Sequence, residues 1–464
     1  MYRKEKFAFG WPGIEARWTS SAKSGVGTSY NARSKVWYSI SHGILNEIYY
    51  PQVDQACTRD LSLIVTDGKE FFSEEKRDTQ HHIKHIAKNV PGYHITNSCN
   101  YHYYRLEKEI ISDPSRDTLL QRIQFFPTNR KRKDFKLFVL LAPHLGNSGA
   151  GNTAWVGDYK GVPMLFARRG DQSLAFACSV PWKKMSAGFV GSSDGWQDLS
   201  KNKQMTWEFE RAENGNVALT AEVDLEEAVN NTFVVALGFG RNPEEAGQRA
   251  RASMFENFDS CKAQFIAEWQ KWQKKLYTFD GGKKNLTPKY FNISATMLRV
   301  HESKRHPGGI IASLSIPWGF SKGDADLGGY HLVWPRDMVQ TAGGLLAARA
   351  FEDARRVLNY LMVTQEGDGH WCQNMWLDGE PYWNGIQMDQ TALPIMLVDL
   401  VNRESGLSEN DLKHFWPMMR KAASYLVTNG PITNQDRWEE NAGYSTFTLA
   451  VEISALLIAA DYAE

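Results

Sequence analysis

The hydrophobic pattern of this 464-residue chain changes its period once, near Asn242 and Pro243. Before this point, apolar residues alternate or run over strand lengths between turn clusters, as in 60–66, 101–111 and 135–141. After this point the helical period of apolar residues dominates. The pattern therefore predicts a multidomain chain in which a β part precedes an α part.

Many short strands with polar turns predict an all-β sandwich over residues 1–242. A helical linker is expected over 243–287, with one or two helices in 244–276 and a hydrophilic break after them. Residues 288–464 form the expected helical domain. Further strands are expected at 173–180, 205–210 and 232–238, and helices at 289–303, 338–350, 352–365, 389–403, 409–428 and 447–463.

Charge and composition exclude several classes of protein. The chain has 53 Lys and Arg against 53 Asp and Glu, so it lacks the basic surplus of a general nucleic-acid binder. The N-terminus shows no apolar run of signal-peptide length, and the most apolar segment, 450–460, contains Glu452 and is too short to cross a bilayer. Five scattered cysteines indicate neither a disulfide framework nor a zinc site. We therefore expect no membrane association and a cytoplasmic protein, with secretion left open.

The first candidate loop, 308–330, leads into a segment in which Arg336 and Asp337 lie at the start of a helix. Asp337 could cap that helix, with Arg336 as its salt-bridge partner, or the pair could bind a ligand. The sequence alone favours neither interpretation. The glycines of the loop do not match a phosphate-binding motif, so nucleotide binding is not expected.

The second loop, 371–389, mixes aromatic rings with amides and carboxylates. Because each buried polar group needs a partner, a packed core rarely holds this mixture. A sugar site is suited by this mixture, since rings stack on sugar faces while amides and acids bind hydroxyls. The alternative is a loop that fills the helical layer. The residues are Trp371, Trp376, Tyr382 and Trp383, together with Gln373, Asn374, Asp378, Gln387 and Asp389.

The third loop places Glu439 and Glu440 directly after Trp438. Two such glutamates are either solvated charges or include a general acid, because a carboxyl that a tryptophan desolvates stays protonated near neutral pH. A fourth loop, 191–199, reads first as a turn around Asp194 and Gly195, and nothing in the sequence supports a sugar-facing role for it.

Taken together in order, these motifs resemble glycoside hydrolase family 15, the glucoamylases and glucodextranases, in its prokaryotic form. The resemblance begins near residue 7 and covers essentially the whole chain. The motifs are AFGWPGIEARW, GILNEIYYPQVD, IIASLSIPWG, GGYHLVWPRD, QNMWLDG, YWNGIQMD and DRWEENAGYS.

The resemblance implies an N-terminal super-β-sandwich, a helical linker and an (α/α)6 catalytic barrel of about twelve helices. It also implies exo-acting hydrolysis of α-glucans from non-reducing ends, with inversion to β-glucose. This chemistry needs no metal, since carboxyls supply both protonation and water activation, and we expect no cofactor. Matched by motif, Arg336 and Asp337 bind the terminal glucose and Trp383 packs beside the sugar. Glu439 matches the general acid, Glu440 binds the adjoining subsite, and Trp438 lines the same pocket.

An inverting glycosidase needs a second carboxyl to activate water on the opposite face of the sugar. Glu440 cannot reach that face from a position adjacent to Glu439. The family's base is a glutamate between the last two barrel helices, which the resemblance places beyond Glu464. The helical pattern also continues to the last residue without a stop signal, so we expect a partial barrel that requires its C-terminal half in cis. Such a fragment would be inactive and would expose apolar faces.

Other interpretations remain open at this stage. The motifs do not separate α-1,4 from α-1,6 specificity, and trehalase-like members share the framework. The chain could also be a non-catalytic carbohydrate-binding protein. A phosphorolytic enzyme ranks last, because no clear phosphate site is present. The acidic segment 322–326 lacks the EF-hand spacing, so no metal is assigned.

Overall fold

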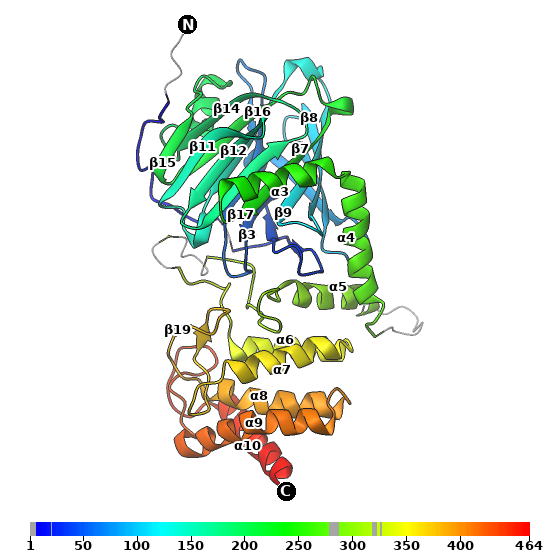
Figure 1. Ribbon diagram of the computed structural model, residues 1–464, viewed down its shortest axis with the longest axis vertical. Coiled ribbons are helices and arrows are strands. Elements are labelled where there is room, and N and C mark those ends of the chain that lie inside the picture. The colour runs from blue at the N-terminus through cyan, green and yellow to red at the C-terminus, as the bar shows by residue number, and fades with distance from the viewer. Residues whose placement is uncertain (1–5, 20, 278–286, 318–322, 325–326) are drawn as a thin grey trace. The chain divides into compact units, whose positions relative to one another are not determined.

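A computed structural model describes residues 6–19, 21–277, 287–317, 323–324 and 327–464 (Figure 1). The chain folds into two compact units. The first comprises Met1–Gln270 with Leu314–Gly329, and the second comprises Lys271–Ser313 with Tyr330–Glu464. Each unit is described by itself.

Within its described residues, the first unit contains two antiparallel sheets of eight and nine strands. The eight-stranded sheet has the order β1-β2-β3-β4-β10-β16-β14, with β5 paired to β4. Its strands are β1 (Gly25–Thr28), β2 (Trp37–Ser41), β3 (Ile44–Tyr49), β4 (Thr58–Thr66), β5 (Phe72–Glu74), β10 (Lys136–Pro143), β14 (Trp182–Phe189) and β16 (Val217–Val223).

The nine-stranded sheet has the order β15-β11-β12-β13-β17-β9-β8-β7-β6. Its strands are β6 (Thr79–His85), β7 (Tyr93–Cys99), β8 (Tyr104–Ser112), β9 (Thr118–Pro127), β11 (Asn152–Tyr159), β12 (Val162–Arg169), β13 (Gln172–Cys178), β15 (Arg211–Gly215) and β17 (Thr232–Gly240). The inner faces of both sheets share one apolar core, which confirms the predicted sandwich.

Alternation along the strands explains this core. In β8, Tyr104, Leu106 and Ile110 are buried at every second position, while the residues between them are more exposed. Lys108 shares the buried face, where its ammonium pairs with the Glu75 carboxylate and donates to the Gly43 carbonyl at 2.7 Å. The charge at this core position is therefore compensated.

Two local predictions in the first unit are wrong. Residues 205–210 are not a strand, because the Asp198 carboxylate accepts the backbone N–H groups of Thr206 at 2.6 Å and Trp207 at 2.9 Å. The segment 191–199 is more than a turn. Its second half begins α2 (Gly195–Asn202), whose first N–H groups bond to the Asp194 side chain.

Short helices α1 (Glu75–Asp78) and α2 accompany the sheets, and two longer helices follow them: α3 (Pro243–Phe255) and α4 (Phe258–Gln273). The Asn242 side chain accepts the Glu245 N–H, and Pro243 occupies the first turn, so α3 begins where the hydrophobic period changes. Helix α3 packs on β17 and β13.

The second unit contains all six helices predicted after residue 288, with boundaries shifted by no more than three residues. They are α5 (Thr287–Val300), α6 (Pro335–Ala347), α7 (Phe351–Val363), α8 (Met388–Arg403), α9 (Glu409–Asn429) and α10 (Thr446–Ala463). The short strands β18 (Asn374–Met375) and β19 (Pro381–Trp383) form a hairpin between α7 and α8. Helix α8 packs against both α6 and α10, while α7 contacts α9, as expected of two helical layers in a partial barrel.

The whole of helix α10, and not only its segment 450–460, is strongly apolar. It has 18 residues, and by length and composition it could cross a membrane, which corrects the prediction that this segment is too short. A single such helix is weak evidence for a span, because a core helix of a soluble protein passes the same test. Val451 and Ala455 are buried, whereas Ile453 and Leu457 are 60% and 64% exposed. The predicted exposure of apolar side chains is therefore present on this helix.

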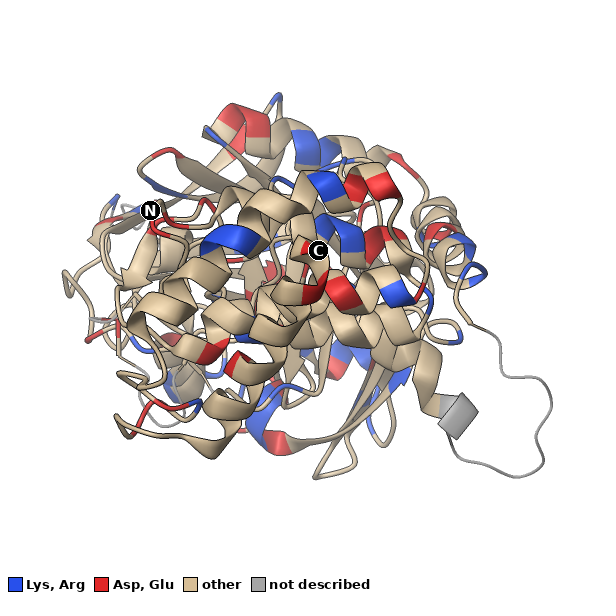
Figure 2. Cartoon of the chain, turned by 90° about the horizontal axis from the view of Figure 1, so that it is seen from below, with Lys and Arg blue, Asp and Glu red and all other residues tan. Residues whose placement is uncertain are grey.

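In Figure 2, ribbon segments that carry Lys and Arg are interspersed with segments that carry Asp and Glu. This distribution agrees with the formal net charge of zero. The absence of nucleic-acid binding stays a prediction.

A buried ion network joins α5 to α7. Glu302, which is 3% exposed, accepts from the Gly308 N–H at 2.9 Å and from Arg356 Nε at 2.8 Å, and it pairs with Arg299. Arg299 and Arg356 also pair with Asp353 on α7. Burial acts to raise the Glu302 pKa, but the two guanidiniums and the Gly308 N–H lower it below its usual value.

We expect Glu302→Gln to lower the free energy of unfolding at pH 7 by about 3 kcal/mol, because it removes a buried carboxylate and leaves the partly buried guanidiniums of Arg299 and Arg356 to share Asp353 alone. The native pKa of Glu302 is depressed, so its stabilisation is present above the unfolded pKa of about 4.3 and is lost as the pH falls through the native value. Urea unfolding of both chains should therefore converge only once the pH has fallen below the depressed native pKa of Glu302. The exposed Glu404→Gln serves as a control and should leave stability unchanged.

Candidate functional site

The N-termini of α6 and α8 lie side by side in the second unit. Pro335 opens α6, and the next backbone N–H, that of Arg336, donates to the Gln390 side-chain oxygen of α8 at 3.2 Å. Helix α8 itself begins at Met388, directly after Gln387. A side chain of one helix therefore satisfies a free N–H of the other, which fixes the two helix starts together.

The Arg336 guanidinium is the centre of a buried polar cluster. Its Nη1 donates to Gln387 Oε1 at 2.6 Å and to Asp389 Oδ2 at 3.0 Å, and the Asp389 side chain is fully buried. Gln390 Nε2 in turn donates to Gln387 Oε1 at 2.7 Å. Among the described residues, Nε and Nη2 of Arg336 have no hydrogen-bond acceptor. The guanidinium is therefore fixed in place with two donor positions left for a ligand.

Asp337 follows Arg336 in the first turn of α6 and is half-buried. Burial raises its pKa, the carboxylates of Glu439 and Asp389 raise it further, and Arg336 opposes the shift. Within the described part of the chain, its carboxylate bonds only to its own backbone N–H. Ionised Asp337 can therefore accept hydrogen bonds from ligand hydroxyls beside a donor guanidinium.

Glu439 lies in a tight turn that approaches the start of α6. Trp334 Nε1 donates to Glu439 Oε1 at 3.0 Å, across 105 residues of sequence. The Asp436 carboxylate holds the turn, because its Oδ1 accepts the N–H groups of Trp438 at 2.9 Å and Glu440 at 3.2 Å. Glu439 has a φ of 66°, in the left-handed region that costs a non-glycine residue about 1 kcal/mol. Strain of this kind is typical of functional sites.

Aromatic rings are exposed on the loops that carry these groups. Trp383 on β19 is 39% exposed and lies beside Tyr382, with ring centroids 5.5 Å apart. Trp438 is 70% exposed, and the Arg437 guanidinium lies over its ring at 4.7 Å. Exposed indoles near fixed polar groups are suited to the apolar faces of a ring-shaped ligand.

Among the described residues, the structure brings some of the sequence-predicted residues into contact and leaves others without a contact to the cluster. Arg336 joins Gln387 and Asp389, and Asp337 lies within electrostatic reach of Glu439. The Glu440 carboxylate and the Trp438 indole nitrogen have no hydrogen bond to any described residue. The assigned roles of Arg336, Asp337, Trp383, Trp438, Glu439 and Glu440 therefore remain predictions.

Sequence reasoning missed three contributors. Gln390 caps α6, Trp334 holds Glu439, and Glu452 on α10 is 5% exposed, with its pKa raised by burial and by Asp389. Trp334 lies inside the quoted motif GGYHLVWPRD, and Gln390 directly follows YWNGIQMD, but neither motif indicated what these two side chains contact. Nothing in the sequence around Glu452 points to the site.

No group of three metal-binding side chains is found among the described residues. In the acidic segment 322–326, Gly323 and Asp324 alone belong to the described part. Asp324 accepts from Ser148 Oγ at 2.7 Å and from the Gly149 N–H at 3.0 Å, so its oxygens serve a local loop.

Together, the sandwich, the paired helices and the fixed arginine–carboxylate cluster define a modular protein with a preorganised polar site at the starts of α6 and α8. Residues 8–274 match the family model for glucodextranase domain N, and residues 289–464 match the model for glycosyl hydrolases family 15. The first match alone spans more than half of the chain. The chain therefore belongs to glycoside hydrolase family 15, the glucoamylase and glucodextranase family.

Individual relatives agree with this assignment. A glucoamylase from Clostridium sp. strain G0005 is 38% identical over 453 residues, which are 98% of this chain and 62% of the relative. The crystal structure of a bacterial glucoamylase complexed with acarbose superposes with a TM-score of 0.93 and 36% identity, covering 99% of this chain and 66% of that one. The chain thus spans less than two thirds of these relatives. A GH92 inverting mannosidase from Bacteroides thetaiotaomicron, at 8% identity and a TM-score of 0.51, shares the fold alone.

We expect Asp389→Asn to reduce the free energy of unfolding by about 3 kcal/mol, because it leaves the buried Arg336 without its counter-charge. Asp399→Asn on the same helix is the matched control, since its partner Arg403 is 69% exposed and such surface pairs contribute less than about 1 kcal/mol. Equal losses in urea unfolding would contradict the central position of the Arg336–Asp389 pair.

Proposed function

We propose that the site binds the terminal glucose at the non-reducing end of an α-glucan and that Glu439 protonates the glycosidic oxygen. The arrangement of Arg336 is the observation that supports this most directly. Its guanidinium is held by Asp389 and Gln387 beside the Asp337 carboxylate, which is a fixed donor–acceptor pair for neighbouring sugar hydroxyls. The relative that was crystallised with acarbose has the same fold at 36% identity.

The Trp334 indole supports the assignment of Glu439 as the acid. By donating to Oε1, it orients the carboxyl and leaves Oε2 to hold the proton that passes to the leaving oxygen. The exposed rings of Trp383 and Trp438 would pack on the sugar, and Glu440 would bind the adjoining subsite. Protonation from one face with water attack from the other releases β-glucose.

Within the described part of the chain, Glu440 cannot be the water-activating base, because its position next to Glu439 keeps it from the opposite face of the sugar. We propose that the base comes from polypeptide outside residues 1–464, in the part of the relatives that this chain does not span. The same polypeptide would cover the exposed side of α10. The 464-residue chain would then bind substrate and release almost no glucose.

Because the proposed binding residues lie within residues 1–464 and the proposed base lies outside them, we expect the chain to bind substrate without turning it over. Calorimetry should detect maltotriose binding to the chain, and Arg336→Lys should weaken it at least tenfold, because an ammonium lacks the fork that contacts ligand and cluster together. The exposed Arg420→Lys is the matched control and should bind normally. Glucose release from maltodextrin at enzyme-like rates would contradict the proposed position of the base.

In a protein extended to the length of its glucoamylase relatives, Glu439→Gln should reduce kcat by about 10²–10⁴-fold while retaining substrate affinity. Turnover of maltotetraose, isomaltose and trehalose by the unsubstituted protein would distinguish glucoamylase, glucodextranase and trehalase-like specificity. An extended protein that binds maltotetraose but hydrolyses none of the three would instead be a non-catalytic carbohydrate-binding protein.

Binding should also depend on the ionisation of Asp337. Because its pKa is raised, the carboxylate takes up a proton at a higher pH than an ordinary aspartate and then loses acceptor capacity. Maltotriose affinity should therefore fall as the pH is lowered toward and below that raised value. In Asp337→Asn the affinity should be lower throughout and nearly independent of pH. An unchanged pH profile in this variant would exclude Asp337 as the titrating group.

A further inference from the structure

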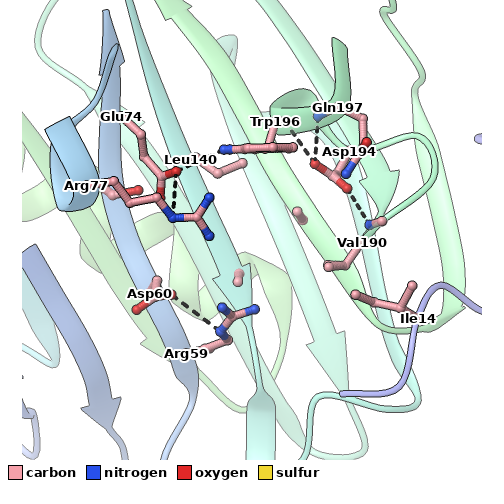
Figure 3. A pocket seen from close by; sticks show the side chains of 14 residues that line it. Ile14, Arg59, Asp60, Glu74, Arg77, Leu140, Val190, Asp194, Trp196 and Gln197 are labelled. Carbon is pink, nitrogen blue, oxygen red and sulfur yellow. Dashed lines mark hydrogen bonds and ion pairs between the residues drawn. The ribbon is translucent and has the colours of Figure 1, made fainter. Parts of the chain in front are cut away.

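The first unit contains a pocket of about 270 Å³ on the outer face of its eight-stranded sheet (Figure 3). On β4, Leu61 and Leu63 face the core, while Asp60 and Ser62 face outward into this pocket. Farther along the same face, Ile64 and Phe138 pack against Leu199 of α2. The sheet face is therefore filled beneath α2 and hollow beside it.

Small side chains on three neighbouring strands produce the hollow. Ser62 on β4, Ala142 on β10 and Ala218 on β16 line its floor. A bulky residue at any of these positions would fill the space, as Ile64 and Phe138 do one pair farther along. The pocket therefore follows from sequence and strand register.

The indole of Trp196 forms one wall and has a fixed orientation. Its Nε1 donates to Glu74 Oε2 at 3.0 Å, and its ring meets Phe72 edge to face with centroids 6.1 Å apart. The guanidinium of Arg77 lies 5.7 Å from the ring centroid. Trp196 and Gln197 belong to the segment 191–199, for which the sequence indicated a turn and supported no sugar-facing role.

The charges around the pocket balance once Lys76, which pairs with Asp60, is included. Three cations (Arg59, Arg77 and Lys76) then accompany three carboxylates (Asp60, Glu74 and Asp194). Arg59 Nε lies 3.4 Å from Asp60 Oδ2, and Arg77 Nε lies 3.4 Å from Glu74 Oε2. In Figure 3 these pairs stand on one side of the hollow, and Asp194 stands opposite them. The carboxylates disfavour an anion and the guanidiniums disfavour a cation, so the complementary ligand is neutral.

Hydrogen-bonding capacity remains at this pocket. The Ser62 hydroxyl, the Gln197 amide and the Nη groups of Arg77 have no hydrogen-bond partner in the described part of the chain. Arg59 Nε is buried without a hydrogen bond, since its contact with Asp60 is a longer ion pair. An indole face together with amide, hydroxyl and guanidinium groups suits a ligand with an apolar face and a rim of hydroxyls.

We propose that this pocket is a second carbohydrate-binding site, which takes one neutral hexose unit, separate from the site at α6 and α8. The pocket's affinity for a sugar follows from its own geometry. The choice of an α-glucan as the natural ligand rests on the proposed function. A single sugar held by one ring face and a few hydrogen bonds binds with a dissociation constant of about 1 mM.

The test uses ¹⁹F NMR of the whole chain labelled with 5-fluorotryptophan, with the Trp196 signal assigned by Trp196→Phe. Maltotriose at millimolar concentration should shift this signal, and the shift should persist in Arg336→Lys, which weakens the other site. Arg77→Met and Gln197→Ala should each weaken the titration at least fivefold. Lys201→Ala, an exposed position on the same helix, is the matched control.

A second variant, Ser62→Leu, fills the floor without removing a charged group and should abolish the shift, with thermal unfolding used to confirm its fold. No Trp196 shift with maltotriose, or a shift that Ser62→Leu and Gln197→Ala leave intact, would overturn the proposal. So would a shift caused by inorganic phosphate in place of maltotriose, because the pocket would then be an anion site. Loss of the shift in Arg336→Lys alone would place the binding at the proposed active site instead. A persistent Trp196 shift in a chain whose α6–α8 site binds nothing would support this pocket while refuting the proposed function.

Discussion

The buried ion pair between Arg336 and Asp389 is the constraint on which the rest of the helical unit depends. A guanidinium in a buried position needs a counter-charge, so the start of α8 must lie against the start of α6. Gln390 then reaches the free N–H of Arg336, and Gln387 shares the guanidinium. The same contacts that pack the helices therefore hold the ligand-facing groups rigid, which a binding site requires.

The fold could be predicted largely from the sequence because the period of the hydrophobic pattern changes at Asn242 and Pro243. These two residues themselves form the cap and the first turn of α3. The polar residues of the helical site could also be predicted from the sequence. Gln387 and Asp389 lie among aromatic residues, and buried polar groups require partners. The specific roles of Arg336 and Glu439 came from resemblance to the family, since local chemistry left a structural interpretation open for both.

Other features could not be predicted, for physical reasons. The contact between Trp334 and Glu439 joins residues 105 positions apart, and no local signal encodes it. The left-handed backbone of Glu439 is imposed by the turn around Asp436 rather than by its own residue type. In the sandwich, the Asp194 side chain accepts a backbone N–H at the start of α2, the helix beside the pocket. The Asp198 side chain accepts the Thr206 N–H, so residues 205–210 do not form the expected strand.

The central claim is that Arg336 and Asp337 bind the terminal sugar of an α-glucan in the helical unit. A crystal structure of the 464-residue chain with bound maltotriose tests it most directly. The account predicts a terminal glucose whose hydroxyls lie within hydrogen-bond distance of the Arg336 guanidinium and the Asp337 carboxylate, with Glu439 beside the first glycosidic oxygen. A fully occupied maltotriose elsewhere in the helical unit, with these three side chains contacting only protein, would contradict it.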